Sequence, residues 1–268
     1  CFTPTQDPDQ LLKSAKPLFN YLESRLEIPV KIIPMTSYSA IVMALQGHHI
    51  DLAFVPGLPA VLAIKTADCR PICIEVQRGK TSYFSHIYVR KDSGIKKLSD
   101  LQGKTIAFTD MTSSSGFLYP LSLFYDANLL DKNKRVYLEL NRFFGKVRWL
   151  GNYESAINSM YNGQVDASCG SQHAPSWYLS EEEQKEIHLL AKAGPLPTHG
   201  IVVRNGLGKV AIDEIQKTLL DLNRPEGKSI LKHLYHADGL VEADVSSYDS
   251  VLKKVYETGL FKDELSGK

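Results

Sequence analysis

The stretch that decides the fold is KTIAFTDMTSSSGFLYPLSLF, residues 104–124. It opens with Lys104–Phe108, a short run of mostly apolar and β-branched residues that predicts a buried strand. Small hydroxyl residues follow at 112–115, and the apolar run from Phe117 to Phe124 predicts a helix. A buried strand that turns directly into a helix is the repeating unit of α/β folds.

The rest of the chain repeats this alternation, which is typical of α/β folds with largely parallel sheets. We expect helices over 8–26, 39–45 and 153–161, and strands over 30–33, 50–55, 72–76, 86–89, 165–168, 187–191 and 201–203. Ser180 and Glu183 have the spacing of a capping box. Beyond 203 the sequence predicts helices, with turns at 225–227 and at Gly239.

Two lobes are the natural division of this pattern. We expect residues 1–89 to form the first part of lobe 1, residues 90–201 to form lobe 2, and residues 202–268 to complete lobe 1. In such folds a ligand binds in a cleft where strand ends and helix starts face each other, so we expect the ligand cleft between the lobes.

Charge and hydropathy exclude two classes of partner. The 268 residues carry 31 basic and 30 acidic side chains, a net charge of +1, whereas nucleic-acid binders present a strongly basic face. No apolar run approaches the roughly 20 residues that span a bilayer. An anionic ligand would therefore need a local binding site.

The segment Thr109–Gly116 is the strongest candidate for such a site. A helix start exposes backbone N–H groups and carries partial positive charge, so it binds anions without any Lys or Arg. The small hydroxyl side chains let a tetrahedral oxyanion approach and add further donors. The turn lacks the Gly-Lys-Ser/Thr ending of a nucleotide-binding loop. The alternative is that these serines only cap the helix.

The cysteines point to two different roles. Cys1 is followed by the polar, Pro-containing segment Phe2–Pro8, as in a lipoprotein whose first cysteine carries the lipid and is followed by a short tether. The alternative is a chain that merely starts at this cysteine. Cys69, Cys73 and Cys169 have no zinc-site spacing, and we expect them to be buried free thiols.

At this point the chain resembles a known family, the periplasmic binding proteins for phosphonate, phosphite and related phosphorus oxyanions. The resemblance covers most of the chain. It rests on the order and spacing of five segments: Pro34–Phe54, Tyr83–Ser85 with Val89–Ile95, Asp100–Lys104, Ser113–Gly116, and Gly163–Ala167. It implies a two-lobed periplasmic-binding-protein fold of type II-like topology that closes on its ligand.

The resemblance also implies site residues. Tyr38, Tyr83, Ser113, Ser114 and Ser115 match the family's ligand contacts. Tyr153 stands where phosphonate binders have a histidine. We add His199 as a possible donor to the anion; a surface or hinge position is its alternative. The aromatic candidates for an apolar wall are Tyr83, Tyr153 and Trp177, although core packing is the simpler role for Trp177.

Besides Tyr153, the chain differs from the phosphonate binders in its carboxylates. Binders of aminoalkylphosphonates use acidic side chains to hold the ligand's ammonium, and the corresponding segments here, 170–173 and 197–200, contain neither Asp nor Glu. Because an unpaired buried ammonium is costly, we expect phosphite or methylphosphonate as the ligand, with phosphate behind them.

The expected function follows from this resemblance. We expect the substrate-binding component of an ABC importer, working with a permease and an ATPase. We expect a monomer in the periplasm, with a lipid on Cys1 as its anchor to the inner membrane or cell surface. Neither a catalytic motif nor a metal or cofactor motif occurs, so we expect no enzyme. The alternative is a phosphate-binding or ligand-sensing protein of the same fold that signals to a membrane kinase.

Overall fold

The computed structural model describes residues 1–2, 8–35, 37–235 and 237–261. These residues form two compact units. Unit 1 contains Cys1–Ser82 and Pro197–Val251, and unit 2 contains Tyr83–Leu196 together with the described residues from Leu252 onward. The lobe boundaries expected after residues 89 and 201 stay a prediction.

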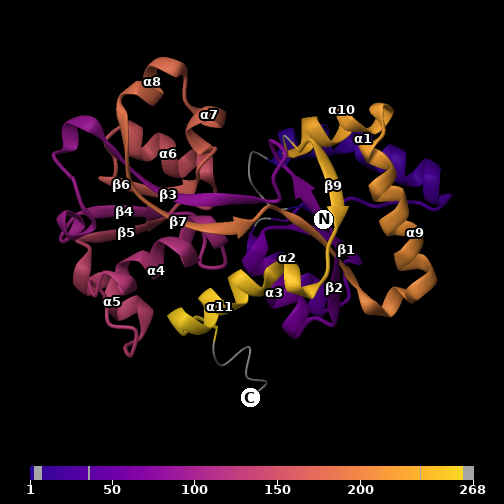
Figure 1. Cartoon of the computed structure of the whole chain (residues 1–268), viewed down its shortest axis with the longest axis horizontal. Coiled ribbons are helices and arrows are strands. Elements are labelled where there is room, and N and C mark those ends of the chain that lie inside the picture. Colours follow the sequence, from indigo (N-terminus) through magenta and orange to yellow (C-terminus); the bar gives the residue numbers. More distant parts are fainter. Residues whose placement is uncertain (3–7, 36, 236, 262–268) are drawn as a thin grey trace. The chain divides into compact units, whose positions relative to one another are not determined.

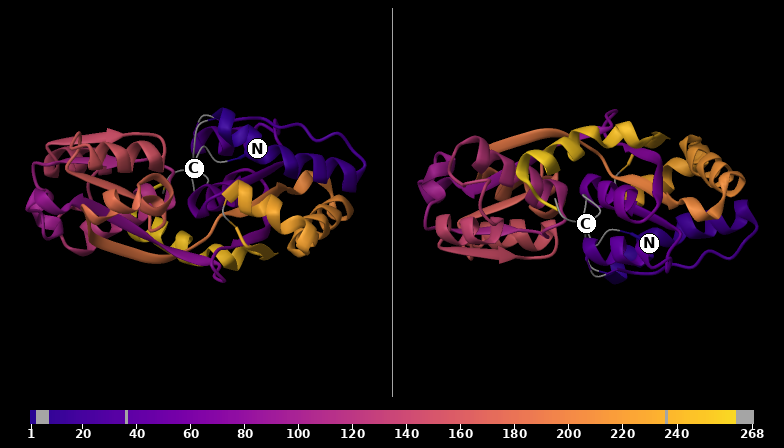
Figure 2. Two further views of the ribbon diagram at one scale, coloured as in Figure 1. Left: turned by 90° about the horizontal axis from the view of Figure 1, so that it is seen from above. Right: turned by 90° about the horizontal axis from the view of Figure 1, so that it is seen from below.

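Unit 1 is built around a four-stranded sheet with the order β1-β8-β2-β9. Helices α1, α9 and α10 lie on one face and α2 and α3 on the other, as Figure 1 and Figure 2 show. The strands are β1 (Leu52–Val55), β2 (Cys69–Val76), β8 (Gly200–Arg204) and β9 (Gly239–Glu242); the helices are α1 (Pro8–Leu26), α2 (Tyr38–Gln46), α3 (Gly57–Thr66), α9 (Lys209–Leu220) and α10 (Pro225–Tyr235).

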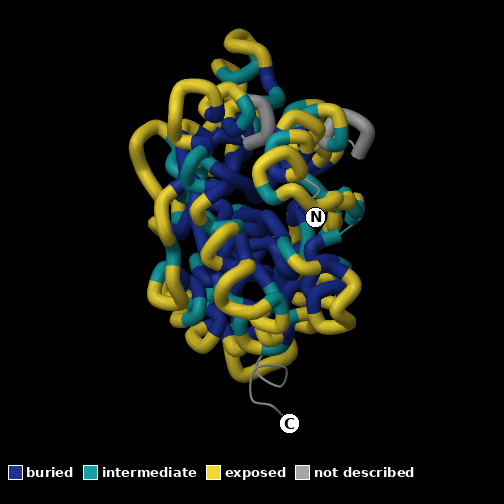
Figure 3. Tube along the Cα trace, turned by 90° about the vertical axis from the view of Figure 1, so that its right-hand side faces the viewer, coloured by how far each residue is buried: buried dark blue, intermediate teal, exposed yellow. Residues whose placement is uncertain are grey.

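Both faces of this sheet are buried. Phe54, Ile201 and Val203 pack in one core with Leu18 of α1 and Leu219 of α9. Their sequence neighbours Ala53, Val55 and Val202 are fully buried as well and point to the opposite face, because side chains alternate along a strand. Each fully buried Val, Leu, Ile or Phe side chain contributes about 1.5–3 kcal/mol to the stability of the fold. Figure 3 shows the buried segments inside and the exposed residues on outer helices and turns.

Four expectations for unit 1 are wrong. Strand β8 pairs antiparallel with both β1 and β2, so the sheet is not largely parallel. Pro225 opens helix α10, where a turn was expected, and Gly239 begins strand β9. Residues 30–33 form no strand; only the next residue, Pro34, makes a parallel bridge, with Phe2.

Unit 2 contains a five-stranded sheet with the order β5-β4-β6-β3-β7. In Figure 1, α6, α7 and α8 lie on one side of this sheet, and α4 and α5 lie on the other. The strands are β3 (Ser82–Arg90), β4 (Thr105–Phe108), β5 (Lys146–Trp149), β6 (Ala167–Ser171) and β7 (Ile187–Pro197); the helices are η3 (Ser114–Leu118), α4 (Tyr119–Asp126), α5 (Val136–Phe143), α6 (Tyr153–Tyr161), α7 (Ala174–Tyr178), α8 (Glu181–Lys185) and α11 (Asp249–Thr258), the last shared with unit 1. Short 3-10 turns occur at Lys91–Ser93, Leu98–Leu101, Asn205–Leu207, Asp221–Asn223 and Val245–Tyr248.

Strand β4 contributes side chains to the packed layers on both faces of the sheet of unit 2. The ring of Phe108 lies 5.1 Å from that of Phe117 at the start of the next helical segment. Ala107, one residue earlier, faces the opposite core with Ile157 and Met160 of α6. The strand therefore holds the turn that follows it between two packed layers.

Several predictions for unit 2 are confirmed. Helix α6 spans the expected residues, and the capping box of α8 is present, with Ser180 and Glu183 bonded reciprocally. β4 pairs in parallel with β5 and β6, as expected of an α/β sheet, although β3 is antiparallel to β6. Helix α5 and strand β5 were not predicted; β5 is an edge strand whose residues are mostly exposed.

The first two residues do not form a polar tether. Phe2 stacks on Phe54 with ring centroids 4.6 Å apart and meets Phe19 edge to face. Cys1 is 8% exposed, and its nitrogen donates to the carbonyl oxygen of Leu52 at 2.7 Å. Residues 3–7 of the expected tether lie outside the described residues, and Pro8 begins α1.

Candidate functional site

The turn between β4 and η3 is held by its own side chains. Asp110 Oδ1 accepts from the backbone N–H of Thr112 at 2.7 Å and from its hydroxyl at 2.6 Å. Ser113 caps the helical segment, with its Oγ accepting from the N–H of Gly116 at 3.0 Å. Ser113, Ser114 and Ser115 are all fully buried. Capping, the simpler of the two expected roles, is thus confirmed for Ser113, and its hydroxyl proton can still be donated elsewhere.

Gly116 is required by close packing within this turn. A Cβ at this position would lie 1.9 Å from Thr109 Oγ1 and 2.8 Å from Ser113 Oγ. The carbonyl oxygen of Gly116 also accepts from the N–H of Thr109 at 3.4 Å. The absence of a side chain thus lets the helix start sit directly on the end of β4.

Ser115 contacts two other predicted site residues, Tyr83 and Tyr153. Tyr83 OH donates to Ser115 Oγ at 3.1 Å, and Ser115 Oγ lies 2.8 Å from Tyr153 OH, where either oxygen can be the donor. Ser85 Oγ donates to the carbonyl oxygen of Ser115 at 2.7 Å. We call Tyr83, Ser85, Ser115 and Tyr153 the hydroxyl cluster. Ser85 was missed as a site residue; its only sequence signal was its place two residues after Tyr83.

The hydroxyl cluster lies at two helix starts. Ser115 is the second residue of η3, and Tyr153 is the first residue of α6, which is capped by Asn152 accepting from Ser155 N at 2.8 Å. The first N–H groups of a helix lack intrahelical partners and carry partial positive charge. The side chains of residues that begin two helical segments thus meet at one hydroxyl, an arrangement that favours a bound anion.

The cluster consists of neutral donors. Burial raises the pKa of the Tyr83 phenol well above its usual value of 10, and the neighbouring Tyr153 raises it further. The phenol therefore keeps its proton and can donate it to an oxyanion. The hydrogen bonds named above that join the members of the cluster involve no Lys or Arg, so charge on an anion held by them would be balanced by hydroxyls and backbone dipoles.

Tyr38 and His199 belong to unit 1. Tyr38 is the first residue of α2, after the cap Ser37, and it is fully buried. His199 directly precedes β8 and is 7% exposed. Burial lowers the pKa of this imidazole to about 4, so it is neutral near pH 7 and would donate a single N–H. Their part in ligand binding stays a prediction.

The structure places the carboxyl group of Glu75 beside His199, a neighbour that the sequence did not predict. Glu75 on β2 is 1% exposed, and its Oε2 lies 4.0 Å from His199 Nδ1. Its backbone N–H donates to the carbonyl oxygen of His199 at 2.8 Å, and its Oε2 accepts from Gln77 Nε2 at 3.2 Å. Burial raises the pKa of Glu75 well above 4.5, which favours the uncharged acid. Pairing across β2 and β8, rather than any local motif, creates this neighbour.

The three internal cysteines are buried free thiols, as predicted. Burial raises the pKa of Cys69 to about 11 and that of Cys73 to about 12, and it raises the pKa of Cys169 as well. Thiols that stay protonated are poor nucleophiles and poor metal ligands. Within the described residues, no group of three or more His, Cys, Asp or Glu side chains could hold a metal ion.

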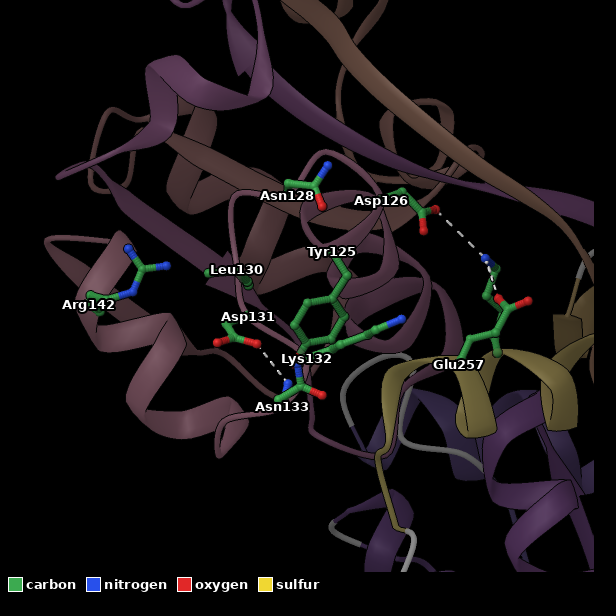
Figure 4. A pocket seen from close by; sticks show the side chains of 10 residues that line it. Tyr125, Asp126, Asn128, Leu130, Asp131, Lys132, Asn133, Arg142 and Glu257 are labelled. Carbon is green, nitrogen blue, oxygen red and sulfur yellow. Dashed lines mark hydrogen bonds and ion pairs between the residues drawn. The ribbon is translucent and has the colours of Figure 1, made fainter.

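Two cavities lie away from the hydroxyl cluster. One, of about 570 Å³ in unit 2, is lined by charged side chains that are largely paired: Lys254 Nζ lies 2.9 Å from Glu257 and 3.9 Å from Asp126, and Figure 4 shows these two acids at one end of the cavity. The other, of about 340 Å³ in unit 1, is mostly apolar. Trp177 does not line either cavity; its ring lies 5.5 Å from that of His173 on α7.

Two α/β units, one of which holds buried hydroxyls on residues that begin two helical segments, fit the class of binding proteins for small anions. The family whose model matches residues 1–248 is described as the periplasmic substrate-binding protein of an ABC phosphonate transporter. The chain belongs to this family. It is a periplasmic substrate-binding component of an ABC importer and not an enzyme, which confirms the resemblance drawn from the sequence.

Relatives support this assignment. The "Phosphonates-binding periplasmic protein" of Escherichia coli (strain K12) is 25% identical over 267 residues, which is 97% of this chain and 75% of that protein. The "Probable ABC transporter phosphite binding protein PhnD1" of Prochlorococcus marinus (strain MIT 9301) is 24% identical over 92% of this chain and 85% of its own length. The solved structure of PhnD1 with methylphosphonate has a TM-score of 0.81 at 20% identity and covers 96% of both chains. In the described part of our chain, no helix has the length and apolar character needed to cross a membrane.

Proposed function

We propose that this protein binds phosphite or methylphosphonate and delivers it to the permease and ATPase of its importer. The observation that carries the proposal is the hydroxyl cluster, in which Tyr83 of β3 is linked by hydrogen bonds through Ser115 to Tyr153, the latter two standing at the starts of two helices. A small tetrahedral anion can accept from such donors with all of its charged oxygens. The names of the relatives from Prochlorococcus marinus, with phosphite and methylphosphonate, support the same choice.

Discrimination against phosphate follows from the number of ligand oxygens that need a hydrogen-bond partner. Phosphite and methylphosphonate each replace one phosphate oxygen with a group that needs no partner. If this group faces the aromatic rings of Tyr83 and Tyr153, the additional oxygen of phosphate would be buried without a partner. Such a loss costs about 1–3 kcal/mol, or roughly fivefold to 150-fold in affinity.

Aminoethylphosphonate should bind more weakly than the amine-free ligands. The hydroxyl cluster contains no carboxylate, and an unpaired buried ammonium is costly. Glu75 is a buried acid beside the predicted contact His199, and its raised pKa leaves it uncharged unless a cation is supplied. The variant Glu75→Gln therefore reports on any role of this residue in holding an ammonium.

The test is calorimetric titration of ligand-stripped protein with phosphite, methylphosphonate, aminoethylphosphonate and phosphate. We expect one of the first two to bind tightly and the other two to bind at least roughly tenfold more weakly. Tight binding of phosphate would favour the alternative of a phosphate-binding protein. Tight aminoethylphosphonate binding that is lost in Glu75→Gln would assign the ammonium site to Glu75 and overturn the proposed selectivity.

Three further points belong to the proposal. Tyr38, Ser113, Ser114 and His199 are predicted ligand contacts, to be tested by single substitution. The protein is proposed to act as a monomer, which light scattering checks. Anchoring by a lipid on Cys1 would appear as added mass on that residue in protein taken from membranes.

A further inference from the structure

Glu75 and His199 form a buried pair within unit 1 that is created by strand pairing. Ile74 of β2 lies opposite Gly200 of β8 in an antiparallel ladder, so the next residues along the ladder, Glu75 and His199, also lie opposite each other. The N–H of Glu75 donates to the carbonyl oxygen of His199 at 2.8 Å. Side chains of directly opposed residues share one face of a sheet, and here Glu75 Oε2 lies 4.0 Å from His199 Nδ1.

Burial leaves this pair with one proton and no net charge near pH 7. An isolated charge on either side chain is costly to bury. Burial raises the pKa of Glu75 well above 4.5 and lowers that of His199 to about 4, so the acid holds the proton and the imidazole is neutral. Moving this proton from the carboxyl group to the imidazole converts two neutral groups into an adjacent ion pair and leaves the net charge at zero.

The surroundings of Glu75 contain donors for its ionised form. Gln77 Nε2 donates to Glu75 Oε2 at 3.2 Å. The phenol of Tyr248 reaches the backbone beside His199, because a Cβ at Gly200 would lie 1.7 Å from Tyr248 Oη. This buried Oη has no hydrogen-bond partner among the described residues, and after burial the charge of Glu75 is the next cause of the raised pKa of Tyr248. A carboxylate accepts several hydrogen bonds, so ionisation of Glu75 would give this phenol an acceptor.

The other titratable groups around the pair keep their charge state between about pH 5 and 8, the range in which histidine ordinarily titrates. Burial raises the pKa of the Cys73 thiol on β2 to about 12 and raises that of the Tyr248 phenol as well. Charged residues on the adjoining elements are exposed to water: Lys65 of α3, Lys209 and Lys217 of α9, Asp238 and Glu242 beside or within β9, and Asp249 of α11. A pH effect in this range that depends on Glu75 is therefore assigned to the pair.

We propose that Glu75 is a positioning residue that supplies His199 with a proton when His199 donates to a bound oxyanion. This inference rests on the proposed function, in which His199 is a ligand contact. The proton leaves the carboxyl group of Glu75 and joins Nδ1 of His199, while the N–H at Nε2 donates to the anion. A carboxylate and an imidazolium result, and no proton is exchanged with water. The anion thus meets a charge-assisted donor, which is roughly twice as strong as a neutral one.

A direct contact between Glu75 and a ligand ammonium is the competing role. Such a contact would act only on ligands that carry an amine. A proton supplied through His199 acts on amine-free anions and makes their binding independent of protons from water. The two roles therefore differ in the ligands that they affect and in the pH dependence of binding.

The first test is the affinity of Glu75→Gln for methylphosphonate and phosphite as a function of pH. In this variant the imidazolium must take its proton from water, so we expect affinity about tenfold below that of the unchanged protein at pH 8, with the ratio shrinking toward pH 5. Titration of the ligand itself cancels in this ratio. Calorimetry in buffers of different ionisation enthalpy should show uptake of up to about one additional proton on binding. The matched control, Glu242→Gln at an exposed acid of β9, should change neither quantity.

The second test removes the acceptor of the proton. His199→Gln keeps a donor but cannot become charged, so Glu75→Gln should have no further effect in this background. A loss of affinity in Glu75→Gln that is independent of pH, or that persists when His199 is replaced, would overturn the proposal. A loss confined to aminoethylphosphonate would assign Glu75 to the ammonium instead.

The third test needs no ligand. In protein labelled with ¹⁵N in its histidines, the ring nitrogens of His199 should respond to two protonation steps, because the two groups titrate as a coupled pair; in Glu75→Gln they should respond to one. A single step in both proteins would show that no proton is shared. If none of the phosphorus anions binds, the proposed function fails, and this measurement still decides whether the pair exists.

Discussion

The hydroxyl of Ser115 meets the phenols of Tyr83 and Tyr153 at 3.1 and 2.8 Å in a part of unit 2 where Ser115 itself is fully buried. A hydroxyl has one proton and two lone pairs, so one Ser115 cannot donate to both a phenol and a ligand. In the proposed site, the remaining hydrogen bonds to an anion would come from the phenols, from the other serines or from the backbone N–H groups at these helix starts. Single substitutions can distinguish these donors.

Replacing Tyr83 with Phe removes one donor and leaves the ring in place. We expect affinity for the preferred oxyanion to fall by roughly 1.5–3 kcal/mol, about 10- to 150-fold, because a hydrogen bond to a charged oxygen is lost. Calorimetric titration measures the change. The matched control is Tyr137→Phe, at a tyrosine of the same unit that is 70% exposed. Equal affinity of Tyr83→Phe and the control would remove Tyr83 from the site.

Gly116→Ala tests the close packing of the turn. The new methyl group would lie 1.9 Å from Thr109 Oγ1, so β4 and η3 must separate. We expect a loss of about 1–3 kcal/mol in the free energy of unfolding, measured by denaturant titration, together with weaker ligand binding. In the control Gly206→Ala, the new methyl group meets only the guanidinium end of Arg204, which can move. If Gly116→Ala changed neither the free energy of unfolding nor ligand binding, the turn would tolerate a wider spacing between β4 and η3.

At the scale of elements, a buried carboxylate of α5, that of Glu139, joins this helix to the segment before it. Glu139 is 2% exposed, accepts from Arg142 Nη2 at 2.6 Å and accepts from the N–H of Asp131 at 2.9 Å. Figure 4 shows Arg142 and Asp131 on neighbouring segments of the charged cavity. The hydrogen bonds from Arg142, followed by that from Asp131, lower the pKa of Glu139 to about 2 from 4.5.

This shift predicts a defined pH dependence. A carboxyl group whose pKa is depressed by folding stabilises the protein above its unfolded pKa and loses this effect as the pH falls through its folded pKa. The contribution of Glu139 should thus be complete above pH 4.5 and decline toward pH 2. Glu139→Gln should lower the midpoint of denaturant unfolding at pH 7. Between pH 4.5 and pH 2, the midpoint of this variant should fall less than that of the unchanged protein. Glu182→Gln, at an exposed acid of α8, should leave both unchanged.

Elements that depend on local pattern were the predictable ones. Helix α6 matched its expected span because it has a cap, an apolar face and a stop at Gly163. Strand β9 was missed because Gly239 signals a turn; pairing with β2 and the hydrogen bonds of the Asn223 side chain to Leu240 make it a strand. Residues 30–33 illustrate the converse, because their composition predicts a strand and they form none within the described residues.

At the scale of the whole molecule, the division between the units falls within three elements, β3, β7 and α11. A ligand that binds only the folded state stabilises it by about 2.7 kcal/mol at 100 times its Kd. We therefore expect the preferred oxyanion at that concentration to raise the thermal midpoint by roughly 5–10 °C. Scanning calorimetry with sulfate as the control anion checks this; an equal shift with sulfate would indicate general anion stabilisation in place of a selective site.

The sequence by itself determined the α/β class, the strand–turn–helix at Thr109–Gly116 and the family, because these depend on local periodicity, on turn chemistry and on the order of short motifs. Only the tertiary structure decided that Ser85 joins Ser115, that Glu75 lies beside His199, and that Phe2 belongs to the core. These contacts are made by residues far apart in the chain. They arise from strand pairing and core packing, whose partners are chosen by the whole fold and leave no signal in any single segment.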